Sequence, residues 1–292
     1  MNCKNILMLP LILIAPILAC IDQEEVELWG ECYNIENTIF LNLMQDGLTG
    51  EIPESVGELT NLVSLILAFN DFSGGIPESI GALQNLEVLD IRSSNLTGEI
   101  PITISGARNI KHIYLNDNNL SGNIPQGIEY LDRLVEVYLE NNNLTGELPE
   151  GLTDIAGLEV LSIYNNNISG QIPEDIGNLS HMEILSLFNN NLTGEIPDSI
   201  CNLSGTIVLD NNSLCPPYPE CLNENFIGFQ NTSECCPIVD GDINNDSILD
   251  ILDIVTIVNC VLSNTCETCT DINEDGQTDV IDIIQIANSI IE

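Results

Sequence analysis

Apolar and polar positions recur every 24 residues from Glu36 to Leu203, in seven copies without an insertion or deletion. One copy, from Ala156 to Leu179, reads AGLEVLSIYNNNISGQIPEDIGNL. The spacing of Leu158, Leu161 and Ile163 predicts a short strand whose alternate side chains point inward. One such unit cannot bury its apolar face alone. Regular repetition therefore predicts a solenoid in which neighbours stack and caps cover the two ends.

An asparagine follows the predicted strand in most copies. A buried Asn amide at this turn can bond to backbone groups that the turn leaves unpaired. Stacked along the solenoid, these side chains predict an asparagine ladder made of Asn70, Asn118, Asn142, Asn166 and Asn190. Asp46 and Ser94 occupy the equivalent positions of the first and third copies, where we expect the ladder to be weaker.

The second half of each copy contains Gly-x-Ile-Pro, which predicts an extended return segment because proline fixes its own φ and restricts the preceding residue. A short helical or 3₁₀ turn is expected to follow. The unit LxxLxLxxNxLxGxIPxxIGxL resembles the plant-specific class of leucine-rich repeats. This resemblance implies a curved solenoid with its strands on the concave side.

The predicted fold class is an α/β leucine-rich-repeat solenoid, with short parallel strands on the concave face and 3₁₀ or irregular structure on the convex side. A small α-helical domain follows it. The predicted segments are a signal peptide (1–19), an N-terminal cap (20–35), the repeats (36–203), a shortened repeat with a Cys-rich cap (204–236) and the final domain (237–292).

The N-terminus has the pattern of a secretory signal peptide. Lys4 precedes an apolar run that is too short to span a bilayer, and we expect cleavage after Ala19. The residues before Cys20 resemble a bacterial lipobox, which implies a lipid anchor on that cysteine. Alternatively, Cys20 pairs with Cys32 in a disulfide. The same sulfur cannot serve both purposes.

Cysteines gather near both ends of the repeats. The sequence from Trp29 to Cys32 resembles an N-terminal cap, with an aromatic side chain over the first repeat. After a shortened repeat from Ile207 to Leu214, four cysteines predict structural disulfides with three alternative pairings, and a zinc site is the competing interpretation. These cysteines are Cys201, Cys215, Cys221 and Cys235.

Five basic residues against 45 acidic ones give a formal charge of −40. Such a charge repels phosphate backbones and anionic lipid head groups, so it disfavours nucleic-acid and peripheral-membrane roles. No segment predicts a transmembrane span. Eleven cysteines together with a signal peptide indicate an oxidising extracellular compartment, which places the protein in the medium or at the cell surface.

The segment after Cys236 has twelve acidic residues, no basic ones, and two loops with oxygen-bearing side chains at positions 1, 3, 5, 9 and 12 of a calcium loop. The carbonyls of Ile248 and Gln277 are available at position 7. The sequence therefore predicts two Ca²⁺ ions, with weaker binding in the first loop, where Ser247 replaces the favoured glycine. The side-chain ligands are Asp242, Asn244, Asp246, Asp250 and Asp253, and Asp271, Asn273, Asp275, Asp279 and Asp282.

Each loop precedes one predicted helix, at Ile251 to Val261 and at Val280 to Ile291. Duplicated half-motifs with Asp at position 12 resemble a type I dockerin, which implies a bacterial extracellular protein and a cohesin-like partner. The partner contacts implied are Ile251, Leu252, Val280 and Ile281. These residues are more apolar than is usual in that family, so an internal docking surface is the alternative. A local disulfide is expected among Cys260, Cys266 and Cys269.

Residues that face outward between the inward-facing leucines carry the functional information, because the core does not constrain them. They predict an aromatic strip on the concave face that binds an extracellular protein or glycan. Alternatively, the aromatic pairs only stabilise the sheet. The predicted ligand-binding residues are Phe69, Arg92, Tyr114, Asn116, Tyr138, Glu140, Tyr164 and Phe188.

The sequence therefore predicts a binding protein, attached through its calcium module. The alternative is a structural or adhesive spacer that this module only caps. We predict no enzyme, because neither a paired carboxylate nor a nucleophile with a base is recognisable outside the repeats and calcium loops. His112 and His181 have no recognisable acid partner and are interpreted as ordinary surface or strand residues.

Overall fold

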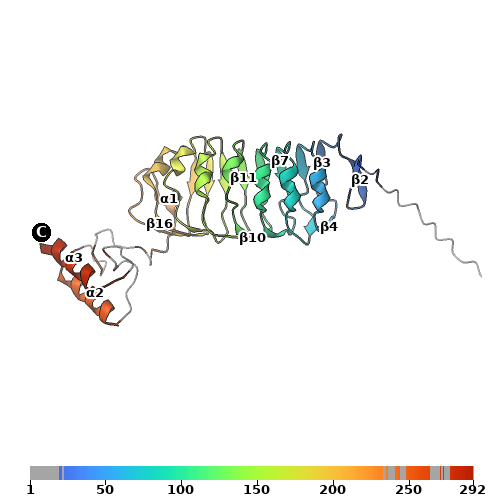
Figure 1. The fold of residues 1–292 in the computed structure, drawn as a ribbon. Helices are drawn as coiled ribbons and strands as arrows, with labels where there is room; N and C mark the ends of the chain where they lie inside the picture. Colours follow the sequence, from blue (N-terminus) through green and yellow to red (C-terminus); the bar gives the residue numbers. More distant parts are fainter. Residues whose placement is uncertain are drawn as a thin grey trace, which may run out of the picture.

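The computed structural model describes residues 20–21, 23–232, 235, 241–243, 248–263, 270, 272 and 277–291. The repeats form an elongated stack, and two further helices come from the C-terminal segment (Figure 1). The predicted signal peptide lies outside the described residues. No described helix is long and apolar enough to cross a membrane.

One strand from each repeat joins a parallel sheet of eight strands, which we call the major sheet. Partners lie one repeat apart, so Val137 pairs with Leu161 and Leu161 with Leu185. The strands are β3 (Phe40–Asn42), β5 (Ser64–Ile66), β7 (Val88–Asp90), β9 (His112–Tyr114), β11 (Glu136–Tyr138), β13 (Val160–Ser162), β15 (Ile184–Ser186) and β17 (Thr206–Val208).

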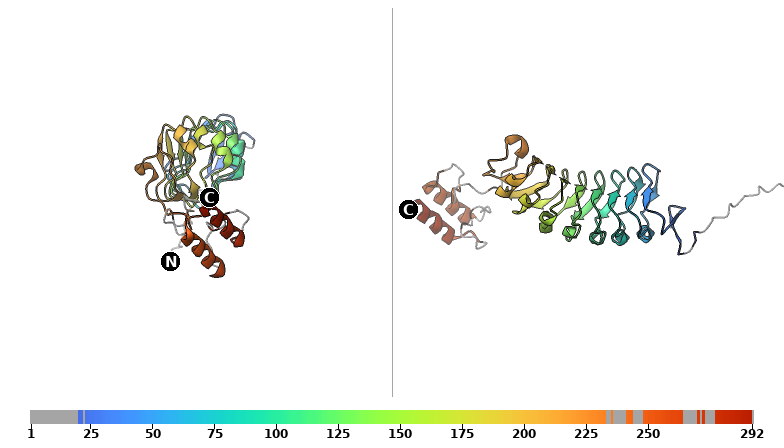
Figure 2. Two further views of the ribbon diagram at one scale, coloured as in Figure 1. Left: turned by 90° about the vertical axis from the view of Figure 1, so that its left-hand side faces the viewer. Right: turned by 90° about the horizontal axis from the view of Figure 1, so that it is seen from above.

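The return segments form three small parallel sheets beside the major sheet. Their strands are β4 (Thr49–Gly50), β6 (Asp71–Phe72), β8 (Thr97–Glu99), β10 (Asn119–Asn123), β12 (Asn143–Thr145), β14 (Ser169–Gly170), β16 (Asn191–Glu195) and β18 (Ser213–Cys215). The predicted turn after each return segment is a 3₁₀ helix, and these helices line one long edge of the solenoid (Figure 2). They are η1 (Glu54–Glu58), η2 (Glu78–Ala82), η3 (Ile102–Gly106), η4 (Ile128–Tyr130), η5 (Glu150–Asp154), η6 (Ile176–Asn178) and η7 (Asp198–Asn202).

The core is one continuous apolar column inside the stack. Leu158, Leu161 and Ile163 are at most 1% exposed, which confirms the predicted inward positions. The column continues into the shortened repeat through Ile207 and Leu209. Each repeat therefore covers the apolar face of its neighbour.

The predicted asparagine ladder is present and buried. Asn142 donates to the carbonyls of Leu115 and Leu139 at 3.0 Å each, and its Oδ1 accepts the N–H of Leu120 at 3.0 Å. One carboxamide thus satisfies backbone groups of two successive repeats. Asn212 and Gln230 make equivalent bonds beyond the seventh repeat, an extension that the sequence did not reveal because the last repeat is shortened.

The two predicted interruptions of the ladder differ from each other. Asp46 is exposed, so the ladder begins at Asn70. Ser94 is fully buried, and its single hydroxyl proton is shared between the carbonyls of Leu67 and Arg92, which lie 3.1 and 3.0 Å from Oγ. In the other repeats, the carboxamide oxygen of the ladder Asn accepts a backbone N–H of the preceding repeat. Serine has no such oxygen, and the equivalent N–H, that of Phe72, bonds to the backbone carbonyl of Ser94.

The N-terminal cap is a hairpin of β1 (Glu25–Leu28) and β2 (Glu31–Asn34). Trp29, at its turn, packs on the apolar column with its ring 5.9 Å from that of Phe72, as the predicted cap requires. A disulfide joins Cys20 to Cys32, the second of the two alternatives for Cys20. That sulfur is therefore not free to carry a lipid.

The C-terminal cap selects one of the three cysteine pairings. Disulfides join Cys201 to Cys221 and Cys215 to Cys235, which leaves none of these four thiols for zinc. The helix α1 (Glu224–Ile227) lies in sequence between Cys221 and Cys235. It packs against β17, and its Ile227 is buried in the column. The disulfides thus hold the segment that covers the last repeat.

Two helices follow, α2 (Ile251–Ser263) and α3 (Val280–Ile291), close to their predicted bounds. They pack on each other, with Ile257 and Ile286 buried at equivalent positions of the duplicated motif. Cys260 is disulfide-bonded. Its expected partners, Cys266 and Cys269, lie outside the described residues.

Replacing Asn142 with Ala leaves the buried N–H of Leu120 without its partner and removes one of the two amide donors from each of the carbonyls of Leu115 and Leu139. We expect the free energy of unfolding to fall by about 3 kcal/mol in a urea titration. Asn143→Ala, at the exposed next position, is the matched control and is expected to stay within about 0.5 kcal/mol of the wild type. If the two variants have the same free energy of unfolding, the ladder does not contribute to stability.

Candidate functional site

The outward face of the major sheet carries three rows of side chains. The first and third residues of each strand point away from the core, as does the residue two positions after the strand. Tyr114 and Tyr138 occupy the third strand position, and Tyr164 and Phe188 lie two residues beyond β13 and β15. All four side chains are partly exposed. Four of the predicted aromatic residues therefore share one face.

The aromatic rings form two stacked pairs across neighbouring strands. The rings of Tyr114 and Tyr138 are 5.4 Å apart, and those of Tyr164 and Phe188 are 4.3 Å apart. The ring of His112 lies parallel to Tyr114 at 6.2 Å, which extends the first stack. Stacked pairs of this kind stabilise the sheet and also offer a flat apolar platform.

Arg92 lies beside the first stack. Its guanidinium carbon is 5.3 Å from the ring centre of Tyr114 and 5.8 Å from that of Phe69. Its Nη2 pairs with the buried carboxylate of Asp90 at 3.2 Å. Its buried Nε makes no hydrogen bond. Aromatic rings and one acid thus hold this cation at the sheet surface.

Glu136 connects two members of the first stack, a role that the sequence did not reveal. Its Oε2 lies 3.2 Å from Nδ1 of His112 and accepts the hydroxyl of Tyr114. Burial and the Glu136 carboxylate raise the pKa of Tyr114 well above its usual value, so the phenol stays protonated. The prediction that His112 has no acid partner was wrong, because the parallel register places Glu136 of the next strand directly opposite.

Two predicted binding residues are placed differently from the prediction. Glu140 is only 7% exposed, and its buried Oε2 has no hydrogen-bond partner. Phe69 lies one position later than the row of Arg92, at a left-handed turn with φ of 60°. It still reaches the face through its contact with Arg92.

The left-handed turn position carries a chain of amides, headed by one carboxylate and partly or fully exposed, that the sequence analysis missed. Each side chain donates to the one before it, at 2.6 to 2.7 Å. Asn116 donates to the first member at 2.7 Å and is partly exposed. The consensus Asn-Asn-Asn of the repeats was the available signal. The chain runs through Asp117, Asn141, Asn165, Asn189 and Asn211.

The second candidate site is the pair of acidic loops. At position 12, the buried carboxylates of Asp253 and Asp282 accept the N–H of Asp250 and Asp279 at 2.8 and 2.7 Å. Asp242, at position 1, is 1% exposed. The two loops thus repeat the same bonds 29 residues apart in a segment without basic residues. Buried carboxylates suit a hard cation, which prefers oxygen ligands.

The structure describes only some members of these loops. Asn244, Asp246, Asp271, Asn273 and Asp275 lie outside the described residues. Ile248 and Gln277, the carbonyl donors expected at position 7, are described and exposed. The four residues implied as partner contacts are each more than half exposed: Ile251, Leu252, Val280 and Ile281.

Burial raises the pKa of Glu140, so the folded state favours its neutral form. Protonation of Glu140 therefore stabilises the folded protein. This contribution to the free energy of unfolding is complete below the pKa of Glu140 in the unfolded chain, about 4.3, and is lost as pH rises through its higher pKa in the folded protein. Glu140→Gln is expected to gain about 1 kcal/mol in unfolding free energy at pH 7 and nothing near pH 4. Glu174→Gln, at an exposed position, is the control. A Glu140→Gln variant that matches the wild type at both pH values contradicts this account.

The repeats match the family model described as the EGF-like domain-containing protein ComC LRR domain, over residues 71–214. A comparison with curated proteins finds no match. Among solved structures, the chain is similar to the ectodomain of the plant membrane receptor kinase GASSHO1/SCHENGEN3 from Arabidopsis thaliana, solved in complex with CASPARIAN STRIP INTEGRITY FACTOR 2. Sequence identity is 38% and the TM-score 0.55, over 57% of this chain and 20% of that one.

Two other similar structures are also plant receptors. The plant peptide hormone receptor RGFR1, in complex with RGF2, is 34% identical with a TM-score of 0.59, over 60% of this chain and 28% of that one. Another is the Arabidopsis receptor kinase HAESA, solved in complex with the peptide hormone IDA and the co-receptor SERK1. It is 37% identical with a TM-score of 0.58, over 62% of this chain and 31% of that one.

The chain thus spans 20 to 31% of the length of these receptors, and their plant origin lends no support to the bacterial source implied by the dockerin resemblance. The family match covers residues 71–214 and does not reach the calcium loops. Together with the parallel register of the strands, the family match and these structures support a leucine-rich-repeat solenoid of the plant type in the repeat region.

Proposed function

We propose that this protein is an extracellular recognition protein whose major sheet binds an extended polypeptide. The observation that carries this proposal is the pair of aromatic stacks on one exposed face, Tyr114 with Tyr138 and Tyr164 with Phe188. Rigid aromatic rings anchor partners at a low cost in side-chain entropy. Two of the similar receptors carry peptide hormones in their solved complexes.

The surroundings of the stacks add specificity. Arg92, Asp90 and Glu136 place charges of both signs beside the first stack. The second stack is followed in sequence by Asn165 and Asn189 of the chain of amides. A carboxamide has both donor and acceptor groups that can bond to the backbone of a peptide. An extended polypeptide uses both features, because it alternates side chains with peptide groups. A glycan is the alternative ligand, since the same rings also stack on sugar faces.

The aromatic stacks are tested by selecting binders from a displayed library of linear peptides against the whole protein. The double variant Tyr138→Ala and Tyr164→Ala breaks both stacks and is expected to weaken the selected peptides at least tenfold. Tyr130→Ala, at an exposed position on η4, is the control. Peptides that bind the double variant as tightly as the wild type contradict the proposal. If the protein binds no peptide but does bind sugars on a glycan array, the ligand is a glycan.

We further propose that the C-terminal module binds two Ca²⁺ ions and attaches the protein to a cohesin-like partner. Asp242, Asp250 and Asp253 would hold one ion and Asp279 and Asp282 the other, with the carbonyls at position 7. The ion would offset the repulsion between carboxylates packed at the first turns of α2 and α3. The alternative is a spacer in which the module only caps the chain.

Calcium removal is therefore expected to unfold α2 and α3 while the repeats stay folded. Addition of a chelator to the whole protein should lower the helical circular dichroism signal, and calorimetry should count two ions per chain. Asp253→Asn with Asp282→Asn should reduce affinity at least tenfold at each loop, whereas Asp154→Asn in an exposed turn should not. A helical signal and thermal transition unchanged by the chelator contradict the calcium proposal.

A further inference from the structure

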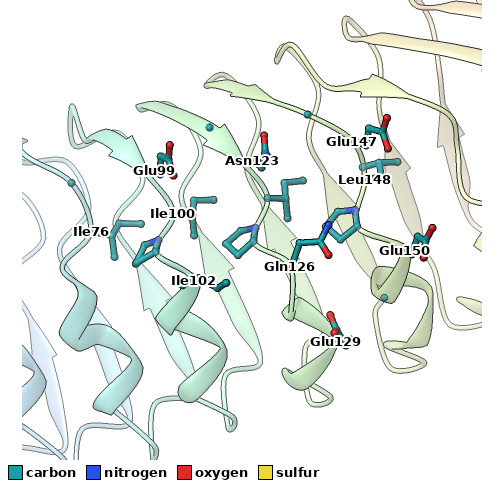
Figure 3. Close-up of a pocket in the computed structure, with 18 of the residues that line it drawn as sticks. Ile76, Glu99, Ile100, Ile102, Asn123, Gln126, Glu129, Glu147, Leu148 and Glu150 are labelled. Carbon is teal, nitrogen blue, oxygen red and sulfur yellow. The ribbon is translucent and has the colours of Figure 1, made fainter.

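A groove of about 1070 Å³ runs along the side of the solenoid, away from the exposed face of the major sheet. It lies between the small sheet β8–β10–β12 and the helices η3 to η5, and it crosses four repeats (Figure 3). Successive repeats are about 4.8 Å apart, so the groove is about 14 Å long. It can therefore hold four to five residues of an extended chain.

The floor of the groove is apolar. It consists of Ile76, Ile100, Ile124 and Leu148, one from each repeat, and three of the prolines that follow them. In Figure 3, Glu99 and Glu147 lie along one edge, and Glu129 and Glu150 lie along the other. Glu78 also lines the groove, and no basic residue does. The groove thus has nearly buried aliphatic side chains and prolines at its base and acidic side chains along both edges.

The rim carboxylates are not neutralised by the protein. Among the described residues, ion pairs involve Arg92, Lys111 and His112, all on or beside the major sheet. Glu99 and Glu147 form no ion pair with any of them. Parallel carboxylates with no cation nearby attract a positively charged ligand.

One rim position departs from the repeat pattern. The first residue after the conserved proline is acidic in five of the seven repeats, and Ile102 and Gln126 are the exceptions. Both exceptions line the groove. The side chain of Ile102 is 63% exposed. An exposed aliphatic residue between acids suits the hydrocarbon stem of a Lys or Arg side chain.

The opposite rim alternates with a period of two repeats. Its seven positions are Glu51, Gly75, Glu99, Asn123, Glu147, Gln171 and Glu195. Two repeats advance about 9.6 Å. A polyproline II helix advances about 9.3 Å in one turn of three residues. A peptide in this conformation with a cation at every third residue therefore matches Glu99 and Glu147.

We propose that this groove binds a cationic peptide segment in the polyproline II conformation, with Lys or Arg at every third position. The acidic rims determine which molecule can supply this segment, because it must carry basic residues. The chain has five basic residues in all, and its C-terminal segment has twelve acids and no base, so neither its own tail nor a second copy complements the rims. The ligand is a segment of another molecule. This site is separate from the aromatic stacks and does not depend on the proposed function.

The probe is a blocked hexapeptide of two Pro-Pro-Lys units, labelled and titrated into the whole protein at about 150 mM salt, where the Debye length is about 8 Å. Glu99→Gln with Glu147→Gln should weaken binding at least tenfold. Glu51→Gln with Glu195→Gln removes the same charge from the same row outside the groove, and it should change binding less than twofold. A peptide of equal composition with adjacent lysines should bind at least threefold more weakly.

A second variant separates the groove from general attraction to an acidic protein. Ile102→Gln leaves the net charge unchanged and removes the exposed aliphatic contact, so it should weaken the probe about threefold to tenfold. An equal loss in both double variants, or no effect of Ile102→Gln, would overturn the proposal in favour of diffuse charge attraction. Absence of binding to the wild-type protein at this salt concentration also overturns it.

Discussion

The structure depends on one constraint: every repeat must satisfy the polar backbone of its neighbour as well as cover its apolar face. At the turn after each strand of the major sheet, carbonyl groups of two successive repeats point into the core, where no water is available. Asn118, Asn142, Asn166 and Asn190 bond to both sets at once. Because one bond of each asparagine joins residues 27 apart in sequence, these bonds hold the repeats in register and disfavour insertions between them.

The same constraint separates structural positions from functional ones. Inward positions are occupied by Leu, Ile or Val in nearly every repeat, whereas outward positions of the major sheet vary from Phe40 through Arg92 to Thr206. Variation at these positions costs little stability, since the core and ladder lie on the other side of the sheet. The aromatic stacks and the acidic groove therefore occur on a scaffold that stays the same from repeat to repeat.

The C-terminal segment has a different source of stability. In the described part of that segment, the fully buried apolar side chains are Ile257 and Ile286, beside the buried acids Asp253 and Asp282. So small an apolar core contributes little, and small domains commonly depend on a metal or on disulfides. The disulfide at Cys260 and the proposed calcium ions are consistent with that requirement. The repeats, by contrast, gain stability from each neighbour.

The sequence alone determined the repeat length, the inward leucines, the asparagine ladder, the 3₁₀ turns and the bounds of α2 and α3. These features follow from local periodicity and from residues such as Pro and Asn, whose preferences act within one repeat. Tertiary structure decided what depends on neighbouring repeats. It paired His112 with Glu136, buried Glu140, selected the disulfide partners of Cys20, Cys201 and Cys215, and lined up distant glutamates along one groove. Residues about 24 positions apart become neighbours only when the repeats stack, so their contacts could not be predicted from one repeat at a time.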